Sequence, residues 1–190
     1  MILFSFTSFF PPSDEACHPI LNYLKFITEN HPDEIIQSWA RFSFSRMVIC
    51  YLGGGRQVLA STFELEYMRD QTKIPFAINF CSGGLIELFI ENYTTVGDLL
   101  DIVMEQLSIN KSRRMFYGFL EQTNRPDRID ECYVEEFVNV CDLVSSWEHE
   151  SHFYKRVLGG TPYNATFKLM FKLKYKYPME DAVEGLEANI

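Results

Sequence analysis

Residues 74–107, IPFAINFCSGGLIELFIENYTTVGDLLDIVMEQL, contain two consecutive patterns that predict the fold of the second half of the chain. Apolar residues alternate with other residues on both sides of Ser82-Gly83-Gly84, which predicts a β-hairpin. The alternating apolar positions are Phe76, Ile78, Phe80, Ile86, Leu88 and Ile90. Thr95 and Asp98 then have the spacing of a capping box, so a helix is expected to follow. The apolar stripe of this helix consists of Val96, Leu99, Leu100, Val103 and Leu107.

More strands and one more helix are expected after this stretch. Residues 115–122 are a strand candidate, residues 125–130 are expected to form a loop, and residues 134–144 have helical apolar spacing. Residues 167–177 alternate between apolar side chains and, mostly, lysines, which predicts a long strand with one buried face. The predicted order is strand, strand, helix, strand, helix, strand, which indicates a small mixed sheet packed on helices.

The residues before position 74 are predicted to be entirely helical. A first helix is expected to start at Ser13 as its cap, with Ile20, Leu24 and Ile27 as its apolar stripe. A second helix is expected over residues 34–52, ended by the following glycines. Its expected apolar side is Ile35, Trp39 and Phe42. Ser61 and Glu64 have capping-box spacing and predict a short third helix through Met68.

Composition excludes several classes of protein. The chain has 190 residues, 47% of them hydrophobic, so it can form a packed core and is not a disordered tail. Its net charge of -9 argues against nucleic-acid binding, which requires a basic surface. Five cysteines without motif spacing favour a reduced, cytoplasmic chain over a secreted disulfide framework. Residues 1–10 are apolar but lack the basic start and the cleavage site of a signal peptide.

The sequence contains no convincing catalytic or metal-binding pattern. The glycines at 53–55 lack the Lys-Ser/Thr ending of a phosphate loop and are interpreted as a helix stop. His149 and His152 could form a metal pair on a helix, but polar surface residues at a helix end are the favoured interpretation. Cys141 with His149 could form a nucleophile pair, but Cys141 lies on an apolar stripe, where a buried, inert thiol is expected. We therefore expect no catalytic residue, no metal and no cofactor.

Four lysines of the last predicted strand are the strongest candidate for a binding surface. They are Lys168, Lys172, Lys174 and Lys176, which share one strand face. One hypothesis is that they bind an acidic partner, such as an anionic membrane surface or an acidic peptide. The other is that they form a solvated face or protect a sheet edge from aggregation. The first hypothesis requires the lysines to face away from the acidic residues of the 127–150 stretch.

Three motifs and their order resemble the tail of unconventional myosins. They are Phe10-Pro11-Pro12-Ser13-Asp14-Glu15, Leu52-Gly53-Gly54-Gly55-Arg56 and Ala60-Ser61-x-x-Glu64. In that family, a helical myosin tail homology 4 domain ends with a Pro-Ser-x-x-Glu element and leads into the ubiquitin-like first lobe of a FERM domain. Residues 68–76 are similar to the family's junction, residues 142–148 to a late helix of the lobe, and residues 167–172 to its closing strand. The motif residues given a structural role by the resemblance are Pro12, Ser13, Gly55, Arg56, Ser61 and Glu64.

The resemblance implies an α+β fold in which a partial all-helical domain is followed by a ubiquitin-like β-grasp lobe. Residues 1–73 would be the C-terminal part of the myosin tail homology 4 domain and residues 74–178 the FERM lobe. Residues 179–190 would be the start of a truncated second lobe. Ala60 departs from the family, which usually has proline at this position.

The implied function is that of a non-catalytic, cytoskeleton-associated module that binds cargo proteins or links membrane to cytoskeleton. Any motor ATPase would lie outside this chain. Some family members bind microtubules, but residues 1–73 carry six Lys/Arg and eight Asp/Glu, and a net charge of -2 does not suit that acidic surface. The alternative is a FERM-type adaptor that binds anionic lipid through the lysine face.

Overall fold

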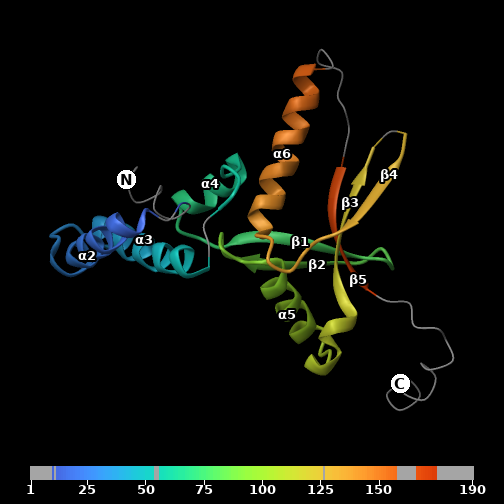
Figure 1. The fold of residues 1–190 in the computed structure, drawn as a ribbon, viewed down its shortest axis with the longest axis horizontal. Helices are drawn as coiled ribbons and strands as arrows, with labels where there is room; N and C mark the ends of the chain where they lie inside the picture. The colour runs from blue at the N-terminus through green and yellow to red at the C-terminus, as the bar shows by residue number, and fades with distance from the viewer. Residues whose placement is uncertain (1–9, 11, 54–55, 126, 158–165, 175–190) are drawn as a thin grey trace.

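The computed structural model describes residues 10, 12–53, 56–125, 127–157 and 166–174 of the chain (Figure 1). It contains helices and one mixed five-stranded sheet, which confirms the predicted α+β class. The helical hairpin of α2 (Asp14–Asn30) and α3 (Glu34–Gly53) lies at one end of the molecule and the sheet at the other (Figure 1). The short helix α4 (Thr62–Arg69) lies between them.

The helical hairpin has a small core of its own. Its buried residues are Cys17, Leu24, Ile27, Ala40 and Met47, with Ile20 and Ile36 packed against them. The predicted stripe of α2 is therefore confirmed. The predicted side of α3 is wrong at Ile35, which is 68% exposed, because the face toward α2 passes through Ile36, Ala40 and Met47. Ser13 precedes α2, but its side chain makes no capping hydrogen bond, and its carbonyl instead accepts from the backbone of Ala16 and Cys17.

The sheet has the strand order β2-β1-β5-β3-β4. Its strands are β1 (Ile74–Phe80), β2 (Leu85–Ile90), β3 (Tyr117–Asn124), β4 (Ile129–Tyr133) and β5 (Thr166–Leu173). Only the pair of β1 and β5 is parallel, and the other neighbours are antiparallel. The predicted hairpin is confirmed as β1 and β2, with Phe76 opposite Leu88 and Ile78 opposite Ile86. Gly83 in its turn has φ +86°, a conformation that favours glycine.

The capping box predicted for the next helix is present at the start of α5 (Val96–Gln106). The Thr95 hydroxyl accepts from the Asp98 backbone N–H at 3.1 Å, and the Asp98 carboxylate accepts from the Thr95 N–H at 2.9 Å. Leu99, Leu100 and Val103 of its stripe are fully buried. They pack with the inner side chains of the sheet, including Ile78, Phe119 and Leu169, in the main core of the molecule.

Two predictions between residues 125 and 144 are wrong. The loop expected over residues 125–130 is shorter, because Ile129 and Asp130 belong to strand β4 (Ile129–Tyr133), which was not predicted and pairs with β3 in an antiparallel hairpin. The following helix, α6 (Val140–Val157), starts later than expected, so Phe137 precedes it and is exposed. The residues just before α6 are held next to the start of α5 by two backbone hydrogen bonds. The Val96 N–H donates to Val138 O, and the Val140 N–H donates to Thr94 O. Asn139 then accepts from the Cys141 N–H at 2.8 Å and starts the helix.

Strand β5 is the central strand of the sheet and is shorter than predicted. It ends at Leu173, and Lys176 and residues 179–190 lie outside the described residues. Leu169 and Phe171 are buried as predicted, but Met170 on the opposite face is buried too. The 3-10 helix η1 (Lys111–Phe116) occupies the beginning of the predicted strand 115–122, and β3 starts after it.

Candidate functional site

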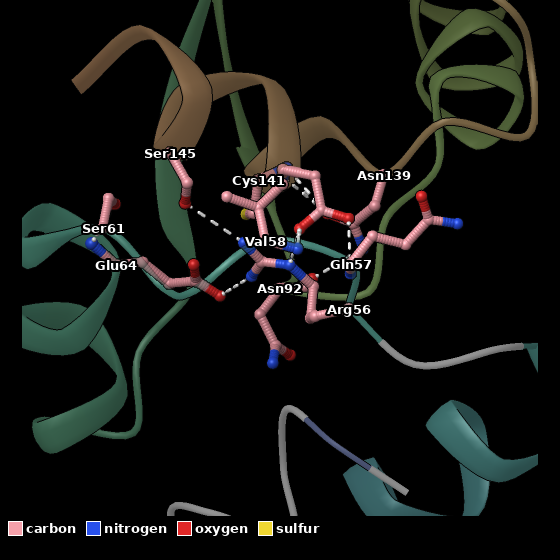
Figure 2. A network of polar contacts seen from close by, with 10 residues as sticks. Arg56, Gln57, Val58, Ser61, Glu64, Asn92, Asn139, Cys141 and Ser145 are labelled. Carbon is pink, nitrogen blue, oxygen red and sulfur yellow. Dashed lines mark hydrogen bonds and ion pairs between the residues drawn. The ribbon is translucent and has the colours of Figure 1, made fainter. Parts of the chain in front are cut away.

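Arg56 is the centre of a buried charge cluster that joins the helical part of the chain to the sheet domain (Figure 2). It follows α3 and is only 6% exposed. Its Nε donates to Asp142 Oδ1, its Nη1 donates to Glu64 Oε1, and its Nη2 donates to Ser145 Oγ at 3.2 Å. Glu64 comes from α4, whereas Asp142 and Ser145 come from α6. One guanidinium therefore binds two helices that are distant in the sequence.

Asp142 also fixes the backbone that carries Arg56. Its Oδ2 accepts from the Gln57 N–H at 3.1 Å, and its Oδ1 accepts from the Val58 N–H at 3.3 Å. A carboxylate that accepts two backbone bonds and an arginine bond is held in one geometry. The chain between α3 and α4 is thereby positioned by the start of α6.

The predicted capping box of α4 is only half formed. The Ser61 hydroxyl accepts from the Glu64 N–H at 3.1 Å, as expected. The Glu64 carboxylate does not reach back to Ser61 but turns to Arg56, and Glu64 is 1% exposed. No described residue hydrogen-bonds its second oxygen, Oε2, which is also buried. The glutamate therefore serves the cluster instead of the helix cap.

The cluster carries two carboxylates for one guanidinium. Burial raises the pKa of Glu64, and Arg56 offsets only part of this effect. Burial alone would lower the pKa of Arg56, but Glu64 and Asp142 outweigh it and leave the pKa of Arg56 raised. Removal of one partner from such a buried arrangement leaves an uncompensated charge, at a typical cost of about 3–5 kcal/mol. The cluster is thus a means of holding a fixed geometry rather than a reactive centre.

Two further polar contacts and one apolar contact connect the helical part to the sheet domain. The Thr62 hydroxyl donates to Glu148 of α6 at 2.8 Å. Arg46 of α3 forms an ion pair with Glu91 at 2.5 Å, at the end of β2, and its guanidinium lies over the Phe42 ring. In addition, Tyr67 of α4 packs against the main core. The two parts are therefore joined by ion pairs, hydrogen bonds and apolar contact.

A cleft of about 770 Å³ lies next to the cluster. It is formed where the end of α3, the start of α5 and the start of α6 meet. Its lining residues include Ile49, Val58, Tyr93, Ile102, Phe137 and Leu143. Asp142 lines the cleft as well, so the charge cluster forms part of its wall. Among these apolar side chains, Ile102 and Phe137 are exposed and the others are half-buried.

No protein-family model matches this sequence. Solved structures do match the fold of the chain. One is the MyTH4-FERM MF1 domain of Dictyostelium discoideum myosin VII, with a TM-score of 0.76 and 22% identity over 90% of this chain and 33% of that one. Another is the MF2 domain of the same myosin, with a TM-score of 0.65 and 15% identity over 91% of this chain and 33% of that one. This chain has the fold of part of a MyTH4-FERM domain.

A third matching structure is the C-terminal MyTH4-FERM domain of human myosin 7b in complex with the harmonin-a PDZ3 domain. Its TM-score is 0.62 and its identity 20%, over 93% of this chain and 33% of that one. The chain thus spans about a third of the length of the structures it matches. The resemblance to myosin tails is confirmed at the level of the fold.

Three of the six predicted motif residues meet in the charge cluster of this MyTH4-FERM fold. Arg56, Ser61 and Glu64 lie together there, whereas Pro12 and Ser13 lie before α2. Gly55 lies outside the described residues. The sequence interpretation missed Asp142 and Ser145 as their partners. A signal was present, because Ser145 is a polar residue four positions after Cys141 on an apolar helical stripe.

Two of the four lysines predicted to form a basic surface are paired with glutamates. Lys172 pairs with Glu131, and Lys174 pairs with Glu136, both at 3.0 Å. Hydrogen bonding from Lys172 lowers the pKa of Glu131. The lysines therefore lie beside acidic residues of the 127–150 stretch, not apart from them. Protection of a sheet edge is also the wrong explanation, because β5 is the central strand.

Lys168 is exposed, and Lys174 has an unusual position across Gly118 of β3. A Cβ at Gly118 would come within 2.4 Å of Lys174 Cε. The glycine therefore leaves the space through which this lysine reaches Glu136.

The thiol and histidine candidates do not form a reactive arrangement. Cys141 is buried in the main core, and burial raises the pKa of its thiol, the opposite of what a nucleophile requires. His149 is exposed on α6, and the side chain of His152 lies outside the described part. No group of three or more His, Cys, Asp and Glu residues suited to a metal ion is present in the described ranges. Over the same ranges, no helix combines the length and apolarity needed to cross a bilayer.

Proposed function

We propose that this chain is a non-catalytic protein-interaction module of a myosin-type tail. In this role it binds cargo proteins or links membrane to cytoskeleton in the cytoplasm, and any motor ATPase lies outside the chain. The observation that carries the proposal is the buried joint, in which Arg56 binds Glu64 of the helical part and Asp142 of the sheet domain. A joint of this kind makes two small domains present one continuous surface.

The cleft beside the joint supports the same role. It is lined from both parts of the chain, by Ile49 and Val58 on one side and Ile102, Phe137 and Leu143 on the other. A cargo segment bound there would contact both parts at once. Its affinity would then depend on their fixed arrangement, because a preformed site avoids the entropy cost of ordering on binding.

The alternative, an adaptor that binds anionic lipid through the lysine face, has less support. Lys172 and Lys174 are already paired with glutamates, and the chain has a net charge of -9. An anionic surface would repel most of this molecule. We therefore favour a protein partner.

The experiment that tests the proposal is proximity labelling in cells of the organism that encodes the chain. The full chain is fused to a biotin ligase, and the free ligase at matched abundance is the control. Enrichment of actin-associated and membrane-linker proteins is the expected result. A labelled set equal to that of the free ligase would contradict it. Long-read sequencing of transcripts then tests the myosin connection, because a motor-coding segment joined upstream is expected.

A further inference from the structure

Strand β2 forms one edge of the sheet and pairs with β1 alone among the described strands. Its sequence is LIELFI, without the lysine, proline or bulge that commonly protects an edge. The opposite edge, β4, has the sequence IDECY and lies beside Arg125 and Arg128, which both pair with Asp130. The β2 edge therefore has a single charged side chain, Glu87, whereas the β4 edge carries several charged side chains of both signs.

The register of the hairpin identifies which backbone groups of β2 are available. The Phe80 N–H donates to Gly84 O at 2.8 Å, so this pair is hydrogen-bonded. Bonded and non-bonded pairs alternate in an antiparallel ladder, so Ile86 and Leu88 also bond to β1. Leu85, Glu87 and Phe89 then direct their N–H and C=O groups away from β1. Pro75 supports this assignment, because it lacks an N–H and lies opposite Phe89.

The same three residues have exposed side chains. Leu85 is 66% exposed, Phe89 is 65% exposed, and Glu87 between them is exposed as well. Glu87 forms no ion pair with any other residue of the described ranges. Because alternate residues share a face, the three side chains form one row of apolar, acidic and apolar character. This row lies along the free edge.

We propose that β2 binds an extended peptide as an added sixth strand of the sheet, and that the peptide places a basic residue between two apolar ones at alternate positions. The backbone groups of Leu85, Glu87 and Phe89 would supply the pairing bonds. Their side chains would select apolar, basic and apolar partners directly opposite, since cross-strand pairs of this kind are favourable. The inference concerns a surface other than the cleft and does not depend on a myosin-tail role.

A second copy of the chain is a poorer occupant of this edge. An antiparallel pair of β2 strands that matches Leu85 with Phe89 of the other copy places the two Glu87 side chains opposite each other. Like charges directly opposite destabilise a strand pair. Charge complementarity thus favours a foreign peptide with lysine or arginine at the central position.

The test uses the full chain and a fluorescein-labelled peptide of about ten residues, in which valine alternates with threonine and one lysine replaces the central valine, so that valine, lysine and valine share one strand face. Fluorescence anisotropy at physiological salt measures its binding. The matched control peptide carries N-methyl groups on alternate residues, which removes the pairing N–H groups on one edge but keeps charge and side chains. A second control peptide carries the N-methyl groups on the remaining alternate residues. Only one of the two sets of N–H groups faces β2 in an added strand, so only one of the two methylated peptides loses the pairing bonds.

We expect one methylated peptide to bind at least about tenfold more weakly, equivalent to about 1.4 kcal/mol, and the other to bind nearly as well as the parent. Glu87→Lys should weaken parent binding, and Glu87→Pro should abolish it while the thermal melt remains cooperative, because an edge strand tolerates proline. Glu131→Pro in β4 is the control for proline in the other edge, and it should leave binding unchanged.

Equal binding of all three peptides would overturn the proposal, because attraction without backbone pairing would then suffice. Absence of parent binding would overturn it too. Sedimentation velocity of the chain alone tests whether a second copy of the chain occupies the β2 edge. A dimer that Glu87→Pro dissociates would assign the edge to a second copy and contradict the foreign peptide.

Discussion

Arg56 and Asp142 are 86 positions apart in the sequence and form a buried ion pair. The first lies between α3 and α4, and the second lies at the start of α6. Glu64 and Ser145 complete the same cluster. The boundary expected near residue 73 is therefore not a simple linker, because residues on its N-terminal side neutralise and position residues of the sheet domain.

Replacement of Arg56 tests the energetic weight of this cluster. Arg56→Met leaves Glu64 and Asp142 buried near each other without a counter-charge, and we expect a loss of about 3–5 kcal/mol in the free energy of unfolding. Urea unfolding followed by circular dichroism measures it. Arg128→Met is the matched control, because Arg128 is exposed and pairs with Asp130 at 3.0 Å. The control should lose at most about 1 kcal/mol, and equal effects of the two variants would contradict the interpretation.

The raised pKa of Glu64, caused first by burial, makes a prediction about pH. Between its ordinary and its raised pKa, the folded state binds more protons than the unfolded state, so this group lowers stability as pH rises through the window. Glutamine does not titrate. The unfolding free energy of the wild type minus that of Glu64→Gln should therefore fall as pH rises from about pH 4.5 through the raised pKa. A constant or rising difference in urea melts would contradict it.

Glu131 provides a control of opposite sign. Lys172 lowers its pKa, so its contribution is present above the ordinary carboxyl range and is lost as pH falls through the lowered value. The corresponding difference between wild type and Glu131→Gln should rise with pH below about pH 4.5. Urea melts at a series of pH values measure both differences.

Fragments test where the sheet domain begins. Residues 74–177 contain the five strands, α5 and α6, and we predict that this fragment folds alone. Residues 1–71 are predicted not to fold alone, because the helical part has exposed apolar side chains such as Phe26 and Ile35. The structure adds that a fragment of residues 56–177 should be more stable than 74–177, because it keeps Arg56 and Tyr67. Thermal melts compare the three. A cooperative melt of 1–71 without one of 74–177 would reverse the assignment.

Leu100 tests the main core. It is 0% exposed on α5, so Leu100→Asp buries an unpaired carboxylate at a cost of several kcal/mol, comparable with a typical total stability of about 5–15 kcal/mol. We expect the sheet domain to unfold. Ile102→Asp on the same helix is the control, because Ile102 is 38% exposed, and it should keep a cooperative melt. A melt of Leu100→Asp within a few degrees of wild type would be inconsistent with this core.

The paired lysines predict weak attraction to lipid. Sedimentation with phosphatidylserine vesicles should show little binding of the wild type at physiological salt, since Lys172 and Lys174 are already neutralised by glutamates. The double variant Lys172→Glu and Lys174→Glu should melt at a lower temperature, because it places like charges beside Glu131 and Glu136. Strong, salt-sensitive binding of the wild type that the double variant loses would instead favour the lipid adaptor.

The sequence by itself determined the local elements of this protein. The hairpin of β1 and β2, the capping box at Thr95 and Asp98, and the stripe of α2 follow from residue spacing and turn chemistry, which act over a few positions. Strand β4 was not predictable in this way. Its charged, irregular sequence becomes a strand only because β3 lies beside it.

Tertiary structure alone decided the partners of the charged residues. Glu64 has the sequence of a helix cap, yet its carboxylate turns to Arg56 because burial makes an unpaired guanidinium far more costly than an incomplete cap. Lys172 and Lys174 alternate as an open basic face should, yet the β3–β4 hairpin and the segment after it bring Glu131 and Glu136 to them. Charge pairs form between side chains that the fold brings within a few ångströms, and no spacing along the chain encodes that distance.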